Sequence, residues 1–380
     1  MDRTARAAAS ASNRVTSGSA TTRFVATLSF AAFFAVTGAD AGELAIYNWA
    51  DYFGPETIAR YEAETGTTVT LGYFDSNEML ETKLLTGGSG YDVVFPATSN
   101  AERELQVGAL LPIEPDRLAN YRNLDPSVLA ALDTVPGGRQ LGVPYTWGTV
   151  GIAYNPALVA ERLGEQPMDR LDAIFKPENA AKLADCGIAM LDSPVEVLSI
   201  ALNYLGAEPY SDDPAELERA GALLSAIAPS VRYFNNQKAT GDLAAGNICV
   251  ALVYSGDAGI AQARAAEAGN GVEVAYAIPR EGTLMWIDLM AIPADSARVD
   301  AAYAFIDYML RPEVIADVTN TVFFANANAA ASALVDPAIL GDPGFYPPVE
   351  VRERLFPDRN LDAKALRGRT RLWTKVKTGT

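Results

Sequence analysis

Three short stretches of the chain each place a large aromatic side chain within three residues of a carboxylate. The first is Trp49-Ala-Asp51-Tyr52, directly after a short β-type run, and the others are Tyr254-Ser-Gly-Asp257 and Trp286-Ile-Asp288. Aromatic faces attract organic cations and contact methylene groups, while carboxylates accept hydrogen bonds from ammonium groups. The combination indicates an alkyl amine as ligand, and three such clusters along the chain are best explained by one shared pocket.

Each carboxylate also has a structural explanation. Asp51 is placed to cap a helix that starts at Pro55, and Asp257 is placed to cap the helix that follows it. Glu196 lies in the first turn of a predicted helix, where the macrodipole favours acids. Asp288 is the hardest to explain in this way, because it interrupts an apolar run, and a buried carboxylate needs a partner or a wet cleft.

The aromatic residues have structural explanations as well. Trp147 and Trp286 both lie in apolar stretches, where either ring can equally belong to the core. Trp373 lies in a C-terminal segment rich in arginine and is interpreted as a packing residue.

The elements that would position these residues follow an α/β pattern. Leu44–Trp49, Val69–Phe74 and Tyr91–Phe95 are predicted strands, separated by predicted helices over Glu56–Thr65 and Asn77–Thr86. Two successive strand–helix–strand units imply a parallel sheet, and ligands of such sheets bind beyond the carboxyl ends of the strands. Trp49, Asp51 and Tyr52 follow one such end and Ser99 follows another, which agrees with the proposed chemistry.

Two later stretches look like strands that cross between domains. They cover residues 143–154 and 277–293, contain few charges, and enclose a second α/β region over 155–280 with predicted helices near 193–205, 213–227 and 258–268. A further amphipathic helix is predicted over Asp300–Leu310. The length of the chain agrees with two domains.

The first 41 residues look like an export signal. A basic start precedes the apolar run Phe24–Val36, and Ala39-Asp-Ala41 is a small-x-small cleavage site. The apolar run is too short for a membrane anchor, and no later segment is long and apolar enough to span a bilayer. The leader holds four arginines and two aspartates, so the formal net charge of −17 becomes −19 in the mature chain. This acidity argues against nucleic acids and anionic membranes as partners.

Cysteine and histidine usage narrows the chemistry. The chain has two cysteines, Cys186 and Cys249, and an exported pair suggests a single disulfide, with two buried thiols as the alternative. The chain has no histidine, which excludes Ser-His-Asp hydrolases and the usual zinc sites. We find no phosphate loop, dinucleotide fingerprint or cluster of metal ligands, and expect neither a metal nor a cofactor. A hydrolase that uses two carboxylates fits the same acids, so the sequence leaves that alternative open.

An ordered set of motifs resembles the periplasmic polyamine-binding proteins, the spermidine/putrescine receptors of bacterial ABC importers. These motifs are Ile46-Tyr-Asn-Trp-Ala-Asp-Tyr52, Phe74-Asp-Ser-Asn-Glu78, Gly90-Tyr-Asp-Val-Val-Phe-Pro96, Leu202-Asn-Tyr-Leu-Gly206, Tyr254-Ser-Gly-Asp257, Phe324-Ala-Asn-Ala-Asn328 and Trp373-Thr-Lys-Val-Lys-Thr-Gly379. The resemblance implies a non-enzymatic, two-lobed type II periplasmic binding protein whose lobes, each a mixed sheet flanked by helices, close over the ligand. We expect one lobe over 42–145 plus 287–332, and the other over 146–286 plus 333–380.

The same resemblance implies a set of ligand contacts. They are Trp49, Asp51, Tyr52, Ser99, Glu196, Tyr254, Asp257, Trp286, Asp288 and Phe324. Asp257 and Asp288 would hold one ammonium end of the ligand, with Glu196 and Asp51 toward the other. Cys186 and Cys249 match positions that form a disulfide in some relatives. The expected partners are a polyamine and an inner-membrane ABC permease, and the protein is expected to be a monomer.

Three positions depart from the family pattern. Ala50 replaces a usual Ser or Thr, Phe324 replaces a frequent Tyr, and Tyr254 replaces a Trp found in many members. Members with Trp at the position of Trp286 tend to prefer spermidine, so the sequence predicts spermidine over putrescine. The alternatives are another amine, such as agmatine, or a small peptide bound by the same fold.

Overall fold

A small parallel sheet opens the chain. The computed structural model describes residues 42–74 and 76–379, so the predicted leader lies outside the described residues. Strand β1 (Glu43–Trp49) pairs in parallel with β2 (Thr68–Phe74) and with β3 (Val93–Val94). Helices α1 (Thr57–Thr65) and α2 (Asn77–Leu85) connect these strands. The two predicted strand–helix–strand units are therefore confirmed, although the third strand is shorter than expected.

Local sequence signals explain where these helices begin and end. Gly66 adopts a left-handed conformation with φ of 71°, and its N–H bonds Glu62 O, which ends α1 at the predicted stop. Ser76 caps α2, since its hydroxyl accepts a hydrogen bond from Met79 N at 3.2 Å.

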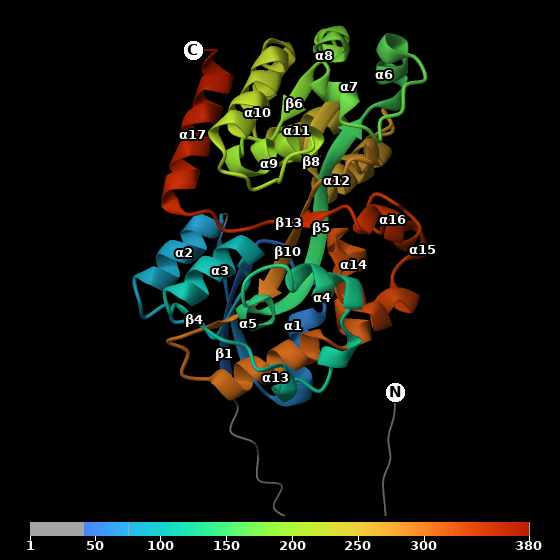
Figure 1. The fold of residues 1–380 in the computed structure, drawn as a ribbon. Coiled ribbons are helices and arrows are strands. Elements are labelled where there is room, and N and C mark those ends of the chain that lie inside the picture. The colour runs from blue at the N-terminus through green and yellow to red at the C-terminus, as the bar shows by residue number, and fades with distance from the viewer. Residues whose placement is uncertain (1–41, 75, 380) are drawn as a thin grey trace, which may run out of the picture. The chain divides into compact units, whose positions relative to one another are not determined.

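Two long strands run through the middle of the molecule and confirm the predicted crossing segments. Strand β5 (Val143–Tyr154) pairs antiparallel with β10 (Leu284–Met290), so that Trp286 lies opposite Gly148 and Asp288 lies opposite Thr146. Figure 1 shows β5 extending from the lower to the upper half, with β13 (Phe356–Pro357) crossing beside it. Strand β13 pairs in parallel with β10, which makes a third crossing segment that the sequence analysis did not predict.

The larger sheet has the strand order β13-β10-β5-β8-β6-β7. Its remaining strands are β6 (Ile188–Met190), β7 (Val231–Phe234) and β8 (Val250–Tyr254), while β9 (Ala275–Ala277) and β12 (Ala325–Asn326) also pair with β5. Short strands β4 (Leu110–Leu111) and β11 (Ile292–Pro293) form a separate pair.

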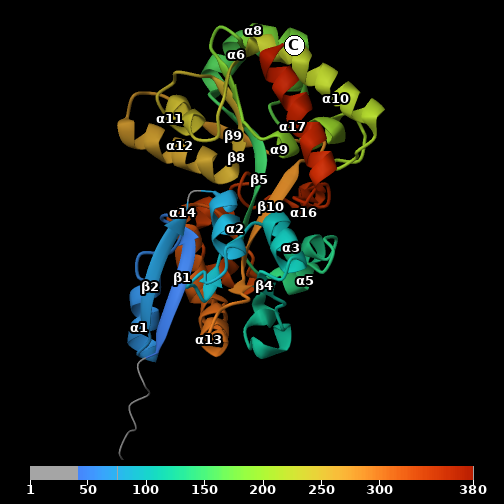
Figure 2. The same cartoon turned by 90° about the vertical axis from the view of Figure 1, so that its left-hand side faces the viewer.

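Helices cover both halves, as the two views show (Figures 1 and 2). Besides α1 and α2, those of the lower half are α3 (Thr98–Gln106), α4 (Pro126–Leu132), α5 (Gly138–Leu141), α13 (Val299–Met309), α14 (Pro312–Val322) and α15 (Pro337–Leu340), while α16 (Val349–Arg352) lies at the level of β13. Those of the upper half are α6 (Pro156–Leu163), α7 (Asp172–Phe175), α8 (Pro177–Leu183), α9 (Pro194–Tyr204), α10 (Pro214–Ile227), α11 (Lys238–Ala244), α12 (Ser255–Ala268) and α17 (Ala363–Thr378). In the described part of the chain, 3₁₀ turns cover Pro115–Arg117, Tyr121–Asn123, Ala228–Ser230 and Ala329–Leu334.

The buried side chains form separate cores in the two halves. The first core draws on residues 44–147 and 285–345, and the second mainly on residues 150–284. Val335 and Phe345 pack in the first core, whereas Trp373 and Val376 pack in the second. The C-terminal stretch is thus shared between the cores, and the lobe boundaries predicted from the sequence stay a proposal.

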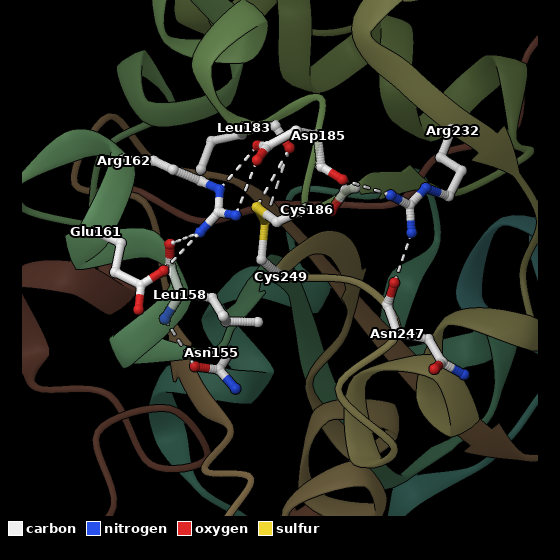
Figure 3. The surroundings of a disulfide bond; sticks show 11 residues. Asn155, Leu158, Glu161, Arg162, Leu183, Asp185, Cys186, Arg232, Asn247 and Cys249 are labelled. Atoms are coloured by element: carbon white, nitrogen blue, oxygen red, sulfur yellow. Dashed lines mark hydrogen bonds and ion pairs between the residues drawn. A yellow bond between two sulfur atoms is a disulfide. The ribbon is translucent and has the colours of Figure 1, made fainter.

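The two cysteines form a disulfide, as predicted. Cys186 and Cys249 are bonded and have their Cα atoms 5.5 Å apart. Each precedes a strand of the larger sheet, and those strands, β6 and β8, are paired neighbours. Figure 3 shows Arg162 and Arg232 on either side of the bond, both contacting Asp185. The bridge therefore links two chain segments that the sheet already brings together.

Candidate ligand-binding site

A pocket of about 690 Å³ lies where the crossing segments meet the ends of β1 and β8 and the first turns of α3, α9 and α12. Nine of the ten predicted ligand residues line it: Trp49, Tyr52, Ser99, Glu196, Tyr254, Asp257, Trp286, Asp288 and Phe324. Residues separated by up to 275 positions in the chain thus share one pocket, as the sequence predicted. Their contacts with a ligand stay a proposal, argued below.

Asp51 is the predicted ligand residue that does not line this pocket. Its backbone has φ of 54°, a left-handed conformation that is uncommon outside glycine, and its side chain is exposed. The turn at Asp51 returns the chain inward, so that Tyr52 is buried and Ala50 contributes to the pocket wall. Helix α1 begins at Thr57 with Glu56 at its N-cap, so the alternative role of Asp51 as a helix cap is wrong.

Asp288 is buried on β10 and is held by a tyrosine. The hydroxyl of Tyr52 donates to Asp288 Oδ2 at 2.7 Å and lies 2.6 Å from Thr146 Oγ1. Burial raises the pKa of Asp288 to about 7, while the hydrogen bond from Tyr52 opposes this shift. Within the described residues the carboxylate therefore has one neutral donor and no ion-pair partner, which leaves it ready to accept an ammonium group.

Glu196 is placed by the first turn of α9, which begins at Pro194. The hydroxyl of Tyr254, at the end of β8, donates to Glu196 Oε2 at 2.7 Å. Burial raises the pKa of Glu196, and this hydrogen bond partly offsets the rise. The pair repeats the tyrosine–carboxylate arrangement seen at Asp288.

Asp257 lies in the first turn of α12. Burial raises its pKa to about 6, while the side chain of Thr240 and the charge of Arg264 act in the opposite direction. Helix α12 has Tyr254 at its N-cap and no side-chain cap, so the alternative role of Asp257 as a helix cap is wrong, and the residue lines the pocket.

Aromatic rings enclose the pocket between these acids. Trp286 and Phe324 pack edge to face with their centroids 4.9 Å apart, and Tyr52 contacts Phe324 in the same way at 5.7 Å. Gly256 permits this arrangement, because a Cβ there would lie 1.6 Å from the Phe324 ring. The rings supply apolar faces for a methylene chain, with carboxylates beyond them.

The other two tryptophans of the sequence analysis are packing residues. Trp147 is buried and donates through Nε1 to Asn326 O at 3.1 Å. Trp373 is buried against Phe234 and donates to Asp192 Oδ1 at 2.7 Å. The core interpretation is therefore confirmed for Trp147 and Trp373, whereas Trp286 lines the pocket.

Asp358 is a pocket acid that the sequence analysis missed. It directly follows β13, is 8% exposed, and accepts a hydrogen bond from Ser99 N at 3.0 Å through Oδ2. Burial raises its pKa to about 6. Phe356-Pro-Asp358 repeats the aromatic–acid spacing of Trp49-Ala-Asp51 and Trp286-Ile-Asp288, and this signal was available in the sequence.

A family model for bacterial extracellular solute-binding proteins matches residues 56–345. The chain belongs to this family. Among the relatives of this solute-binding protein, the putrescine-binding periplasmic protein SpuD of Pseudomonas aeruginosa is 45% identical over 90% of the chain and 93% of its own length. The putrescine-binding periplasmic protein PotF of Escherichia coli is also 45% identical, over 90% and 93%. A spermidine/putrescine-binding periplasmic protein of Salmonella typhimurium is 30% identical over 82% and 85%.

Solved structures agree with the fold of this solute-binding protein. The spermidine/putrescine ABC transporter substrate-binding protein PotD of Streptococcus pneumoniae superposes with a TM-score of 0.78 at 29% identity, covering 89% of this chain and 99% of its own. A putative spermidine/putrescine ABC transporter protein from Listeria monocytogenes gives a TM-score of 0.73 at 31% identity, covering 89% and 100%. The predicted type II periplasmic-binding-protein fold is confirmed.

Besides Glu78 and Asp192, the pocket of the solute-binding protein is lined by four carboxylates whose pKa values burial raises: Glu196, Asp257, Asp288 and Asp358. None of the ion pairs within the described residues involves any of these four. The described part of the chain also shows no group of three or more side chains arranged to hold a metal ion, and no helix there is long and apolar enough to cross a bilayer.

Proposed function

We propose that this protein is a receptor that captures a linear polyamine and delivers it to an ABC importer. One observation carries the proposal: four carboxylates that form no ion pair with any described residue surround the rings of Tyr52, Tyr254, Trp286 and Phe324 in one pocket. An unpaired carboxylate away from water is costly, so this arrangement is useful only if a cation from outside completes it.

The shape of the charge distribution favours a chain with ammonium groups over a single compact cation. Asp257 and Asp288 are the proposed anchors for one ammonium end, and Glu196 is the proposed acceptor toward the other. The aromatic rings cover the methylene groups between them through apolar and cation–π contacts. Asp51 is not part of this proposal because it lies outside the pocket lining.

The relatives support the place of this receptor in transport. Proteins 45% identical to this chain are named periplasmic putrescine-binding proteins, and a structural neighbour is named an ABC transporter substrate-binding protein. We infer that residues 1–41 direct export to the periplasm and that the mature protein works there as a monomer with an inner-membrane permease. A transport receptor performs no chemistry, so the ligand should be released unchanged.

The ranking of ligands rests on opposing arguments. Trp286 predicts spermidine over putrescine, because its broad face suits a secondary ammonium that putrescine lacks. The names of the 45%-identical relatives support putrescine, and a 43%-identical relative is named a putrescine/agmatine-binding protein. The proposal is therefore made for the class of linear polyamines, with spermidine over putrescine as its testable refinement.

Calorimetric titration of the purified mature protein with putrescine, spermidine, agmatine and spermine tests the proposal. We expect one-to-one binding, and a ligand at 100 times its Kd should add about 2.7 kcal/mol to the unfolding free energy. The matched control is 1,4-butanediol, which keeps the four-carbon chain and lacks both charges. No binding and no thermal shift with any amine would refute the receptor. An altered ligand recovered after incubation would favour the hydrolase instead.

A further inference from the structure

The acids of the pocket are not independent of one another. In addition to the effect of burial, the negative charge of Asp358 raises the pKa of Asp288 on β10 and that of Glu196 on α9. Asp358 is therefore an electrostatic neighbour of both, although they belong to opposite halves of the pocket. We call Glu196, Asp288 and Asp358 the carboxylate cluster.

The chain holds Asp358 firmly in this cluster. Its N–H bonds Met285 O at 3.0 Å, which continues the pairing of β13 with β10. On the preceding residue, Pro357 O accepts a hydrogen bond from the Tyr210 hydroxyl at 2.7 Å. Two residues after Asp358, Asn360 N donates to Glu102 Oε2 of α3 at 3.2 Å. The backbone is hydrogen-bonded on both sides of Asp358, and Ser99 N donates to its Oδ2 at 3.0 Å, so the carboxylate is held in the pocket.

Few donors serve these three carboxylates, and all of those within the described residues are neutral. They are the Tyr52 hydroxyl on Asp288, the Tyr254 and Ser193 hydroxyls on Glu196, and the N–H and hydroxyl of Ser99 on Asp358. The second oxygen of Asp358, Oδ1, is buried without a hydrogen-bond partner among the described residues. Three like charges with only neutral donors repel one another and are poorly solvated.

The other titratable and charged groups that face the cluster do not neutralise it. Tyr145 and Tyr52 lie beside Asp288, and Tyr210 and Tyr254 lie beside Asp358 and Glu196, all with their pKa values raised mainly by burial. Glu102 of α3 adds a further negative charge beside Asp358. The nearby cations are Arg103 and Arg359, which line the same pocket, and Arg369, and none of them forms an ion pair with a cluster acid among the described residues. Arg103 pairs with Glu81, Arg369 bonds backbone and Ser199 oxygens, and Arg359 makes no ion pair within the described residues.

We propose that the carboxylate cluster holds a proton while the pocket is free of ligand, and that capture of a polyamine cation releases this proton to the solvent. The inference rests on the proposed function, since the displacing charge is the ammonium group. The exchange is balanced: a neutral carboxylic acid loses one proton to the buffer, and the carboxylate that remains accepts the ammonium hydrogen bond. The ligand's primary amines titrate near pH 10, so at pH 6.5 the ligand binds as the full cation and is not itself the source of the proton.

The direction of the pKa values agrees with this exchange. The pKa of Asp288 is raised to about 7 and that of Asp358 to about 6, so a proton is retained close to neutral pH. A bound cation favours the ionised form and lowers both values, which expels the proton. Because the acids titrate as a coupled group, the proton belongs to the cluster and not to one residue.

Titration calorimetry in two buffers of different ionisation enthalpy, phosphate and ACES, measures the protons exchanged. With spermidine or putrescine at pH 6.5, we expect release of about 0.3 to 1 proton per ligand. Release should fall toward zero at pH 8.5, where the cluster is already ionised. In parallel, the apparent Kd should fall about threefold to tenfold between pH 5.5 and 7.5.

Two variants assign the proton. Asp358→Asn removes both its own titrating group and its charge beside Asp288, so it should lower the release at pH 6.5. Glu104→Gln is the matched control, because Glu104 is a buried acid of the same helix as Ser99, has a raised pKa, and does not line the pocket. It should leave the release unchanged.

The outcomes separate this inference from the proposed function. Identical observed binding heats in both buffers, before any correction for buffer ionisation, would overturn the proton exchange and leave the receptor intact. The coupled cluster would also be overturned if Asp358→Asn folds, binds and releases as many protons as the wild type, because the proton would then come from an acid that does not depend on Asp358. The wild-type measurement stands even if the variant fails to fold. Absence of any binding would refute the proposed function instead.

Discussion

The Tyr52 hydroxyl donates a 2.7 Å hydrogen bond to the carboxylate of Asp288, across 236 positions of the chain. Tyr52 comes from the turn after β1 and Asp288 from the crossing strand β10, so the bond joins the first strand to the centre of the molecule. It provides the one direct hydrogen bond to the Asp288 carboxylate within the described residues. A second, charged donor is expected from the ligand.

Asp288→Asn should weaken polyamine binding strongly. The change keeps the shape of the side chain and removes its charge, so the ligand's ammonium group loses its ionic partner in a desolvated site. Breaking one partner of such a pair costs about 3–5 kcal/mol, which corresponds to roughly two to four decades in Kd. Calorimetry measures the loss. Asp300→Asn, at a fully exposed side chain, controls for the change in net charge, and Asp288→Asn binding within threefold of wild type would show a structural role.

The same substitution should stabilise the ligand-free protein at high pH. The folded state holds the Asp288 proton with a pKa of about 7, above the unfolded value of 3.8, so this contribution to stability is complete below about pH 4. It is lost as the pH rises to 7. Asp288→Asn has no such loss and should gain on the order of 2–4 kcal/mol relative to wild type between pH 4.5 and 8. Urea unfolding without ligand measures this, and parallel pH profiles for the two proteins would contradict it.

Glu104→Gln should be a stabilising substitution outside the pocket. Glu104 is fully buried on α3, neither of its carboxylate oxygens has a hydrogen-bond partner among the described residues, and burial and the charge of Glu81 raise its pKa to about 8. The ionised form is costly above pH 8, so the gain should be about 1–3 kcal/mol at pH 9 and smaller at pH 6. Thermal unfolding at both pH values measures the gain. A larger gain at pH 6 than at pH 9 would show that ionisation is not its cause.

Reduction of the Cys186–Cys249 bond should lower stability more than ligand affinity. The bond joins residues 63 positions apart within one half of the molecule, and neither cysteine lines the pocket. The chain-entropy model assigns such a loop about 4 kcal/mol. Denaturant unfolding with and without reductant measures the stability, and titration under the same conditions measures the affinity. Alkylation of two thiols in the folded, unreduced protein would refute the bridge.

Trp286→Phe should narrow the difference in affinity between spermidine and putrescine. Phe offers a smaller aromatic face to a secondary ammonium than Trp does. In the wild type, the Trp286 ring packs edge to face with Phe324. Titration of both amines into the wild type and the variant decides the matter. A wild-type preference for putrescine, or a difference that the substitution leaves unchanged, would show that residue 286 does not set the choice.

Local patterns in the sequence were sufficient for much of the fold. Helix α1 ends at Gly66 and α9 starts at Pro194 because glycine and proline act through their own backbone geometry, which needs no distant partner. The crossing strands β5 and β10 were visible as apolar runs, because a strand that is buried along its length needs apolar side chains at successive positions. The aromatic–acid clusters also pointed to one pocket, because strands that end at the same edge of a sheet bring such residues together.

The assignment of individual acids to the pocket depended on the tertiary structure. Asp51 and Asp358 carry the same chemistry in similar sequence contexts, yet Asp51 is exposed and Asp358 is buried in the pocket. A left-handed backbone at Asp51 turns its side chain outward, and the pairing of β13 with β10 places Asp358 beside Ser99, 259 positions earlier in the chain. The sequence by itself determined which residue types meet at the pocket. Only the tertiary structure decided which carboxylates face it, because one backbone dihedral and one long-range strand pairing reverse the direction of a side chain without changing the local pattern.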